Sequence, residues 1–363
     1  MSLYKIKREL LRLVKNLVRD YPCCFTESFR ERIIARWNHW QYCDETMQKH
    51  LHHGSLPLLR HGLVRLDLDF LSGFGETVHP DVIFVPAGWR HEDWRYLMTL
   101  TPLPHGAEYF ENPEFVVSRD GIHWQLPMNG RSPVVSPPDV WLGFNSDPSL
   151  VLEGSVLYLF YRDIREYNEN DVEVRVLLTS TSDGIKWASP AVIISLHHSR
   201  KYPALLMSPS ILKIGDCYYM WYVSGDGCDF SVFRRKSKDL LIWGQPEKTL
   251  VNGLRESEWP WHLDIVQNGA ELIAVLCTSH KNNFRRKSIY FATSCNGGIT
   301  WIVKNMHLSP GDYGFGEASL YRGALVNDAS QGAWKLYYSG QDDQKHWYTV
   351  LMDLDMDSLE VNK

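Results

Sequence analysis

Five short segments share a pattern that brings side chains capable of acid–base chemistry to equivalent positions. Each reads polar residue, then Pro or a small or apolar residue, then Asp or Ser, then an aliphatic residue. The copies are His79-Pro80-Asp81-Val82, Asp147-Pro148-Ser149-Leu150, Ser208-Pro209-Ser210-Ile211, His262-Leu263-Asp264-Ile265 and Glu317-Ala318-Ser319-Leu320. Histidine exchanges protons near neutral pH, and carboxylates act as acids, bases or nucleophiles. The leading residues of the copies are therefore candidates for acid–base catalysis at one site.

Each copy is followed by short apolar runs that read as strands separated by turns. Four of the five units then continue into a turn that ends in Trp, at residues 120–124, 183–187, 239–243 and 297–301. An Asp-Gly pair favours a tight turn, and the Trp suits the start of an outer strand. Four strands repeated five times predict an all-β fold, a five-bladed β-propeller.

The first 60 residues have a different character. Apolar residues at helical spacing alternate with basic ones, which predicts an amphipathic α-helical extension over 1–60 before a catalytic propeller domain at 61–363. Such a helix packs on its own domain, pairs with another protomer to form a homo-oligomer, or lies on an anionic membrane surface. The sequence leaves these three roles open.

Composition narrows the class of protein. The 363 residues are 44% hydrophobic and 22% charged, as expected of a globular chain, and a net charge of -5 argues against a nucleic-acid partner. No apolar run is long enough for a membrane-spanning helix, and basic residues interrupt the N-terminus where a signal peptide would be apolar. The seven Cys lack metal-binding spacing and suit a reducing compartment. We therefore expect a cytoplasmic location.

In a propeller, the first strand of each blade lines the central channel, so the leading residues of the five copies should surround one funnel. Side chains two residues further along a strand point the same way. The second layer, which includes Asp81, Ser210 and Asp264, should therefore lie deeper in the channel. Asp and Ser at such positions are expected to bind backbone amides or channel water.

The exit loops of the second strands should form the funnel rim, where binding groups concentrate. The first loop offers Glu111 as a candidate acid. We expect substrate contacts from rim and channel residues, namely Tyr109, Asn112, Arg162, Ser208, Arg285 and Asp264. Because Arg binds carboxylates through a bidentate fork, the rim arginines favour an acidic substrate, which would be an acidic sugar such as a uronic acid if the family resemblance given next holds.

The Asp-Pro-Ser at 147–149, the Ser-Pro-Ser at 208–210 and the Asp-Gly-x-x-Trp turns resemble those of the five-bladed glycoside hydrolases. This superfamily includes family 43 arabinanases and xylosidases, family 32 invertases and related phosphorylases. The resemblance covers residues 61–363 and implies an acidic base or nucleophile in blade one, an Asp in blade two and a Glu acid in blade three. This chain has His79, Asp147 and Ser208 there, so only Asp147 matches. A related family that acts on anhydro-galactose is thought to use a His as its acid.

Glycoside hydrolysis needs a proton donor and a carboxylate that faces the anomeric carbon. Asp147 and Glu317 are the carboxylates of the upper ring, and their separation across the funnel favours inversion. His79 and His262 could serve as acid or base. No metal site is predicted, because His262 and Asp264 alone are too few ligands, although a structural Ca²⁺ in the channel stays open.

Two alternatives to a glycosidase remain. Because Ser208 replaces the expected acid, the chain could be a sugar-binding propeller without activity. It could also be a polysaccharide lyase that uses His and Tyr on a uronate. Lyase products absorb ultraviolet light, hydrolase products carry new reducing ends, and a binding protein yields neither. The sequence therefore predicts a carbohydrate partner and, first of all, a glycosidase.

Overall fold

The computed structural model describes most of the chain after residue 57. Its described residues are 14, 58–59, 63–71, 75–90, 93–106, 108–138, 142–168, 171–198, 205–225, 229–312, 316, 318–328 and 332–354. The predicted helical extension over 1–60 lies outside them, apart from residues 14 and 58–59. No helix in this part of the chain is long and apolar enough to cross a membrane.

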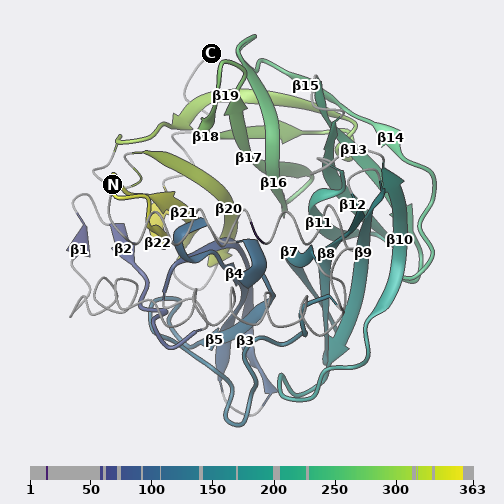
Figure 1. Ribbon diagram of the computed structural model, residues 1–363, viewed down its shortest axis with the longest axis vertical. Helices are drawn as coiled ribbons and strands as arrows, with labels where there is room; N and C mark the ends of the chain where they lie inside the picture. Colours follow the sequence, from purple (N-terminus) through teal and green to yellow (C-terminus); the bar gives the residue numbers. More distant parts are fainter. Residues whose placement is uncertain are drawn as a thin grey trace.

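Five sheets surround a central axis, which confirms the predicted five-bladed propeller (Figure 1). Blade one holds β3 (Thr77–Trp89), β4 (Trp94–Pro102), β5 (Glu114–Ser118) and β6 (Trp124–Gln125). Blade two holds β7 (Leu142–Glu153), β8 (Val156–Asn168), β9 (Asp171–Thr181) and β10 (Ala191–His198). Blade three holds β11 (Met207–Ile214), β12 (Cys217–Gly225), β13 (Phe230–Ser237) and β14 (Glu247–Lys248).

The last two sheets have five strands each. Blade four contains β16 (Glu258–Asn268), β17 (Glu271–His280), β18 (Asn283–Ser294) and β19 (Thr300–Leu308), with β15 (Leu250–Asn252) parallel to β19. Blade five contains β20 (Ser319–Asp328), β21 (Ala333–Gln341) and β22 (Trp347–Leu354). Its outer strands are β2 (Leu63–Arg65) and β1 (Leu58–Leu59), which precede blade one in sequence. The pairing of β2 with β22 therefore closes the ring.

The turns behave largely as the sequence predicts. The Asp120 carboxylate accepts hydrogen bonds from the amides of Ile122 and His123, and the Asp183 carboxylate repeats this in blade two. In blade one the outer strand begins at the turn's Trp, as expected. In blades two and three it begins later, at Ala191 and Glu247.

The repeated pattern coincides with a break in strand pairing. In blades one to three the register between the first and second strand shifts within the motif. In blade four the shift lies just before the motif, between Pro260 and His262, and in blade five it lies after the predicted copy, between Leu320 and Gly323, so the fifth copy is out of register with the other four. The leading residue has a left-handed backbone in three blades, with φ of 58° at His79, 50° at Asp147 and 54° at Ser208. Each is followed by Pro, which has no N–H to donate to the ladder. Such backbone costs about 1–3 kcal/mol per residue, so the surrounding sheets must hold it in place.

The deeper layer links neighbouring blades, which supports the structural role expected of it. Asp81 Oδ2 accepts a hydrogen bond from the Leu150 amide at 2.7 Å, joining blade one to blade two. Asp264 Oδ2 accepts one from the Leu325 amide at 3.1 Å, joining blade four to blade five. Ser210 Oγ donates to Asp264 Oδ1 at 3.1 Å.

Arg322 completes this layer from blade five. Its Nη2 donates to Asp81 Oδ1 at 3.0 Å and its Nη1 to the Pro148 carbonyl at 2.6 Å, and the side chain has no exposed surface. Burial and the proximity of Asp264 raise the pKa of Asp81 to about 7, although Arg322 acts in the opposite direction. Burial also raises the pKa of Asp264. We infer that the two carboxyls share one proton near neutral pH.

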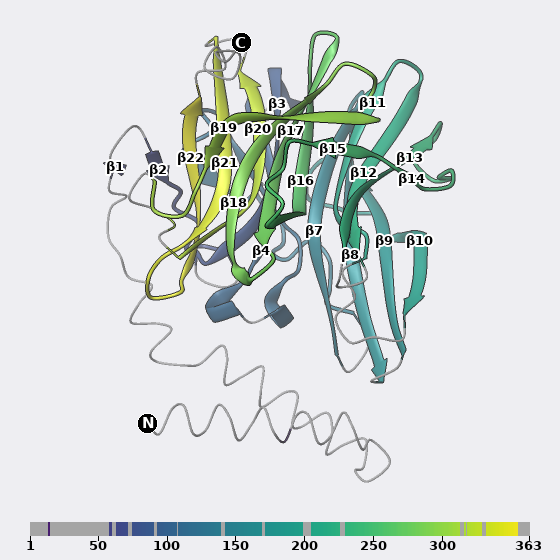
Figure 2. The same cartoon turned by 90° about the horizontal axis from the view of Figure 1, so that it is seen from above.

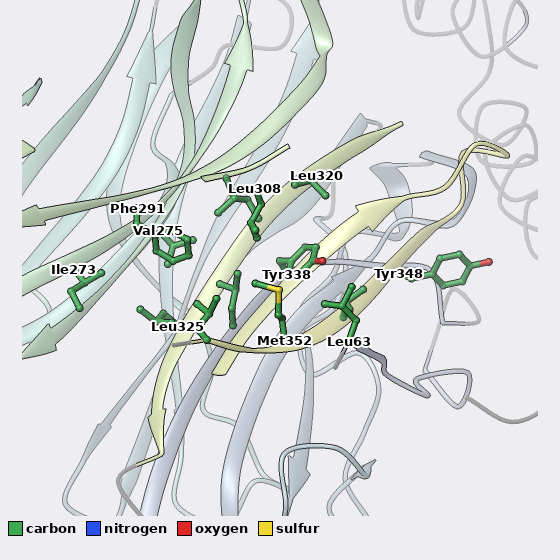
Figure 3. Packing of buried hydrophobic residues seen from close by; sticks show 14 residues of the cluster. Leu63, Ile273, Val275, Phe291, Leu308, Leu320, Leu325, Tyr338, Tyr348 and Met352 are labelled. Atoms are coloured by element: carbon green, nitrogen blue, oxygen red, sulfur yellow. The ribbon is translucent and has the colours of Figure 1, made fainter. Parts of the chain in front are cut away.

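Apolar side chains fill the spaces between blades. Between blades four and five, Val275, Phe291, Leu325 and Tyr338 belong to one buried cluster, which Leu63 of β2 also joins (Figure 3). From the side, the chain after β4 and the far end of β8 reach the same end of the ring (Figure 2). The ends of β4 and β8 that lead into two of the predicted rim loops therefore lie at one face.

The shared proton predicts a pH-dependent stability. The folded protein keeps the proton on Asp81 up to about pH 7, whereas the unfolded chain loses it near 3.8. Folding therefore takes up a proton between these values, and the free energy of unfolding should fall as pH rises from about 4 to 7 by an amount on the order of a few kcal/mol.

We expect Asp81→Asn, which stays neutral, to flatten this slope in urea denaturation at pH 5 and 8. An unchanged slope would contradict the shared proton. Asp81→Ala should destabilise at both pH values, because it leaves Arg322 without its partner.

Candidate active site

A cavity of about 140 Å³ opens at the funnel, and all five blades contribute to it. Its polar wall includes the leading residues of blades one, two and four. Its lining consists of His79, Glu108, Glu111, Phe144, Ser146, Asp147, Arg162, Ile164, Met207, Trp261, His262 and Tyr321. Five predicted site residues thus meet in one cavity, namely His79, Asp147, His262, Glu111 and Arg162.

The centre of the cavity is a cluster of two imidazoles around one carboxylate. Asp147 Oδ1 lies 2.9 Å from His262 Nδ1 and 3.5 Å from His79 Nε2. All three residues are buried. The other nitrogen of His79, Nδ1, lies 2.9 Å from Thr101 Oγ1, which fixes the ring and leaves Nε2 to face Asp147.

The facing atoms of this cluster have the chemistry of a metal site. His262 Nδ1 and Asp147 Oδ1 are within hydrogen-bond distance of each other, whereas the buried His79 Nε2 makes no hydrogen bond within the described residues. One ligand atom from each residue lies within 4.8 Å of the others. Catalytic zinc sites commonly use three such N and O ligands and keep a further position open. These residues could therefore hold a divalent cation with one side open to the cavity.

The electrostatics of the cluster suit a cation. Burial is the main reason that the pKa values of His79 and His262 are lowered, although Asp147 favours their protonated forms. A deprotonated imidazole presents a lone pair that can bind metal. Burial opposes ionisation of Asp147, but the neighbouring imidazoles and Arg162 outweigh it and hold its pKa well below the usual range. Asp147 is thus a carboxylate.

The pKa of Glu111 is shifted in the opposite direction from that of Asp147. It is 6% exposed, and burial followed by the charges of Glu108 and Asp147 raises its pKa well above the usual range. A carboxyl that keeps its proton near neutral pH can donate it to a leaving group. Glu111 and Asp147 therefore have different protonation states within one cavity.

An aromatic wall closes the other side. The Tyr321 ring lies 4.5 Å from that of His262 and 5.0 Å from that of His79, measured between centroids. Trp261 meets His262 edge-on at 5.8 Å. Neither Tyr321 nor Trp261 is predicted as a site residue from the sequence. Each lies at the strand-pairing break of its blade, so proximity to the repeated motif was the signal that could have found them.

Other predicted residues lie elsewhere. Ser208 Oγ donates to the Leu263 carbonyl at 2.8 Å, and Asp264 binds Ser210 and the Leu325 amide, so both join blades below the cavity. Arg285 lines a different cavity together with Arg286 and Asn283. Asn112 is buried against Asn145. Glu317 and the side chain of Tyr109 lie outside the described residues.

Comparison with known proteins extends these observations. Residues 111–362 match the glycoside hydrolase 130 family, described as beta-1,4-mannooligosaccharide phosphorylase. A solved N-acetylgalactosamine deacetylase from F. plautii, in complex with blood group B trisaccharide, superposes with a TM-score of 0.70 at 20% identity and covers 84% of this chain and 98% of that one. Xylan beta-1,4-xylosidase from Bacillus halodurans C-125 gives a TM-score of 0.60 at 14% identity, over 80% of this chain and 55% of that one.

A curated relative is also similar in sequence. "A type blood N-acetyl-alpha-D-galactosamine deacetylase" from Flavonifractor plautii is 24% identical over 322 residues, which cover 76% of this chain and 40% of the relative. This chain therefore spans about two fifths of the length of that protein.

The cluster geometry predicts metal binding. We expect the chelator-treated protein to bind about one Zn²⁺ or Mn²⁺ per chain in isothermal titration calorimetry. His262→Ala and Asp147→Asn should each weaken binding by about tenfold or more, because each removes one of three ligands. His197→Ala removes an exposed histidine that also lies beside an acid, Asp171, and should bind as the wild type does. Equal affinity in all four proteins would contradict the site.

Proposed function

We propose that this chain, which belongs to the glycoside hydrolase 130 family, is a deacetylase. In this proposal the protein binds a divalent cation in its funnel and hydrolyses the N-acetyl group of an acetamido sugar. The family membership confirms the sequence prediction of a glycoside hydrolase-like enzyme that acts on carbohydrate. The proposal concerns which bond is cut. The convergence of His79, Asp147 and His262 is the main observation behind it, and the similarity to an N-acetylgalactosamine deacetylase from F. plautii, in sequence and in structure, supports it.

The three ligands would hold the cation at the base of the cavity. When bound, such a cation acts as a Lewis acid on a carbonyl oxygen and activates water at neutral pH. His79 and His262 would bind through neutral nitrogens, and Thr101 would keep His79 aligned.

The remaining residues have separate tasks in this scheme. Hydrolysis breaks the C–N bond of the acetamide, adds hydroxide to the acyl carbon and leaves a proton on the nitrogen, so a proton carrier must face the leaving amine. Glu111 fits this task because its pKa is raised by burial. Arg162, whose Nη1 lies 3.8 Å from Asp147 Oδ2, supplies positive charge beside the carboxylate. The apolar side chains of Phe144, Met207 and Trp261 offer a surface for the acetyl methyl group.

Cleavage of a glycosidic bond is the second candidate. Its specific support is the contrast between Glu111, with a raised pKa, and Asp147, with a lowered one, since glycosidases need one protonated and one ionised carboxyl. The sugar-binding and lyase alternatives remain as outcomes of the same assay. An acidic substrate would be recognised by Arg162, the arginine that lines this cavity.

A product screen separates these activities. We expect the metal-loaded protein to release acetate and a free amine from oligosaccharides that carry N-acetylgalactosamine or N-acetylglucosamine. New reducing ends without acetate would support glycosidic cleavage, an ultraviolet-absorbing product would indicate a lyase, and bound but unchanged sugar would indicate a binding protein. Each of these last three outcomes overturns the deacetylase proposal.

Variants test the residue roles in the acetate assay. Asp147→Asn should abolish turnover, because it removes a metal ligand. Glu111→Gln should lower kcat by about 10²–10⁴-fold, the usual contribution of a general acid or base, with metal affinity unchanged. Asp353→Asn is the control for Asp147→Asn. It makes the same Asp-to-Asn change at a residue whose side chain is 66% exposed, and it should leave kcat unaltered. Full activity in Glu111→Gln would remove Glu111 from the mechanism.

A further inference from the structure

The loop that carries Glu111 is attached to the strand that carries Asp147. This loop follows β4 and contains two short 3-10 turns, η4 (Pro104–Gly106) and η5 (Glu108–Phe110). The Glu111 amide donates to the Glu108 carbonyl at 2.9 Å, which closes the second turn. The contacts between this loop and β7 decide where the Glu111 carboxyl lies relative to the metal ligands.

Asn145 of β7 makes those contacts. Its backbone amide donates to the Glu111 carbonyl at 2.8 Å. Its side-chain Nδ2 donates to Asn112 Oδ1 at 2.9 Å and to the Ser136 carbonyl at 3.0 Å. Asn145 is 1% exposed and Asn112 is 5% exposed, so water does not compete for these bonds.

We propose that Asn145 is a positioning residue that fixes the distance between Glu111 and Asp147. Asn145 is only two residues before Asp147 on β7, and it holds Glu111 and Asn112 on the rim loop. We call the hydrogen bonds from Asn145 to Glu111, Asn112 and Ser136 the clamp. The clamp joins the proton carrier of blade one to the metal ligand of blade two. The inference rests on the proposed function, because it assigns Glu111 the role of proton carrier.

The amide chemistry suits this position. Both side-chain N–H groups of Asn145 meet oxygen acceptors, one on the rim loop and one on the segment that precedes β7. An Asp in its place would turn a carboxylate toward two oxygens, and an Ala would leave both acceptors without this donor. In Asn145→Ala the backbone bond to Glu111 persists, so the loop should loosen without detaching.

Asn145→Ala should therefore lower kcat by about tenfold or more, because displacements near 1 Å at a reacting group can cost up to 10²-fold. Its affinity for Zn²⁺ should stay within about twofold of the wild type, because the metal ligands lie on β3, β7 and β16 and not on the loop. Asn112→Ala, which removes only one acceptor, should act in the same direction with a smaller loss.

Thr179→Ala is the matched control. Thr179 is buried in the same blade, and its hydroxyl donates to a backbone carbonyl, that of Ala188, at 2.6 Å, but it does not contact the rim loop. The control should change kcat by less than about twofold, the range expected of a site without contact to the reacting groups.

Amide hydrogen exchange of residues 108–112 gives a second readout that does not depend on the substrate. Faster exchange there in Asn145→Ala, but not in Thr179→Ala, is expected. If the wild type releases no acetate, the proposed function fails, while the exchange result still tests the clamp. Exchange equal to the wild type, unchanged kcat, or a loss of Zn²⁺ affinity that parallels the loss of kcat would overturn the positioning role.

Discussion

The guanidinium of Arg322 connects three blades at the centre of the ring, and both the fold and the site depend on it. It binds Asp81 of blade one and the carbonyl of Pro148 in blade two. Because Pro148 follows Asp147 directly, the same hydrogen bond fixes the backbone that presents the central carboxylate. The positive charge of Arg322 also disfavours protonation of His79 and His262, so it helps to keep both imidazoles neutral. One buried charge thus stabilises the ring and prepares its ligands.

The site depends on a backbone that the sheet alone would not adopt. At the motif, strand pairing breaks and the chain becomes left-handed at His79 and Asp147. This turn directs two side chains at one point above the channel. Ser208 has the same backbone, yet its hydroxyl binds the Leu263 carbonyl in the next blade. The same left-handed backbone therefore recurs in these three blades. The type of residue at that position determines whether its side chain lines the cavity or binds the neighbouring blade.

The sequence predicted the ring, the bonded residues Asp81, Ser210 and Asp264 of the deeper layer, and five of the twelve residues that line the cavity, because the repeat and the strand order place them. It identified His79, Asp147 and His262 individually, but not their convergence on common atoms, which depends on the φ values at the pairing breaks. It did not predict that Tyr321 and Trp261 line the cavity, because the alternation of side-chain direction along a strand does not hold through a bulge. It interpreted Asn112 as a substrate contact, because a polar residue on a rim loop gives no sign of its burial. Asp264 was expected both in the deeper structural layer and as a substrate contact, and its bonds to Ser210 and the Leu325 amide agree with the first role.

The closure of the ring by β2 and β22 has a consequence for how the chain folds. Val64 pairs with Leu351, whereas the pairs inside blades one to four join strands that are near neighbours in sequence. Contacts between distant residues form slowly, because a long loop must first be ordered. During synthesis the first four sheets can assemble as their hairpins emerge, but the fifth cannot be completed before β22 has been made. A chain that stops short of β22 would leave β2 without its partner and expose two sheet edges, so completeness of the polypeptide is itself a condition for a closed funnel.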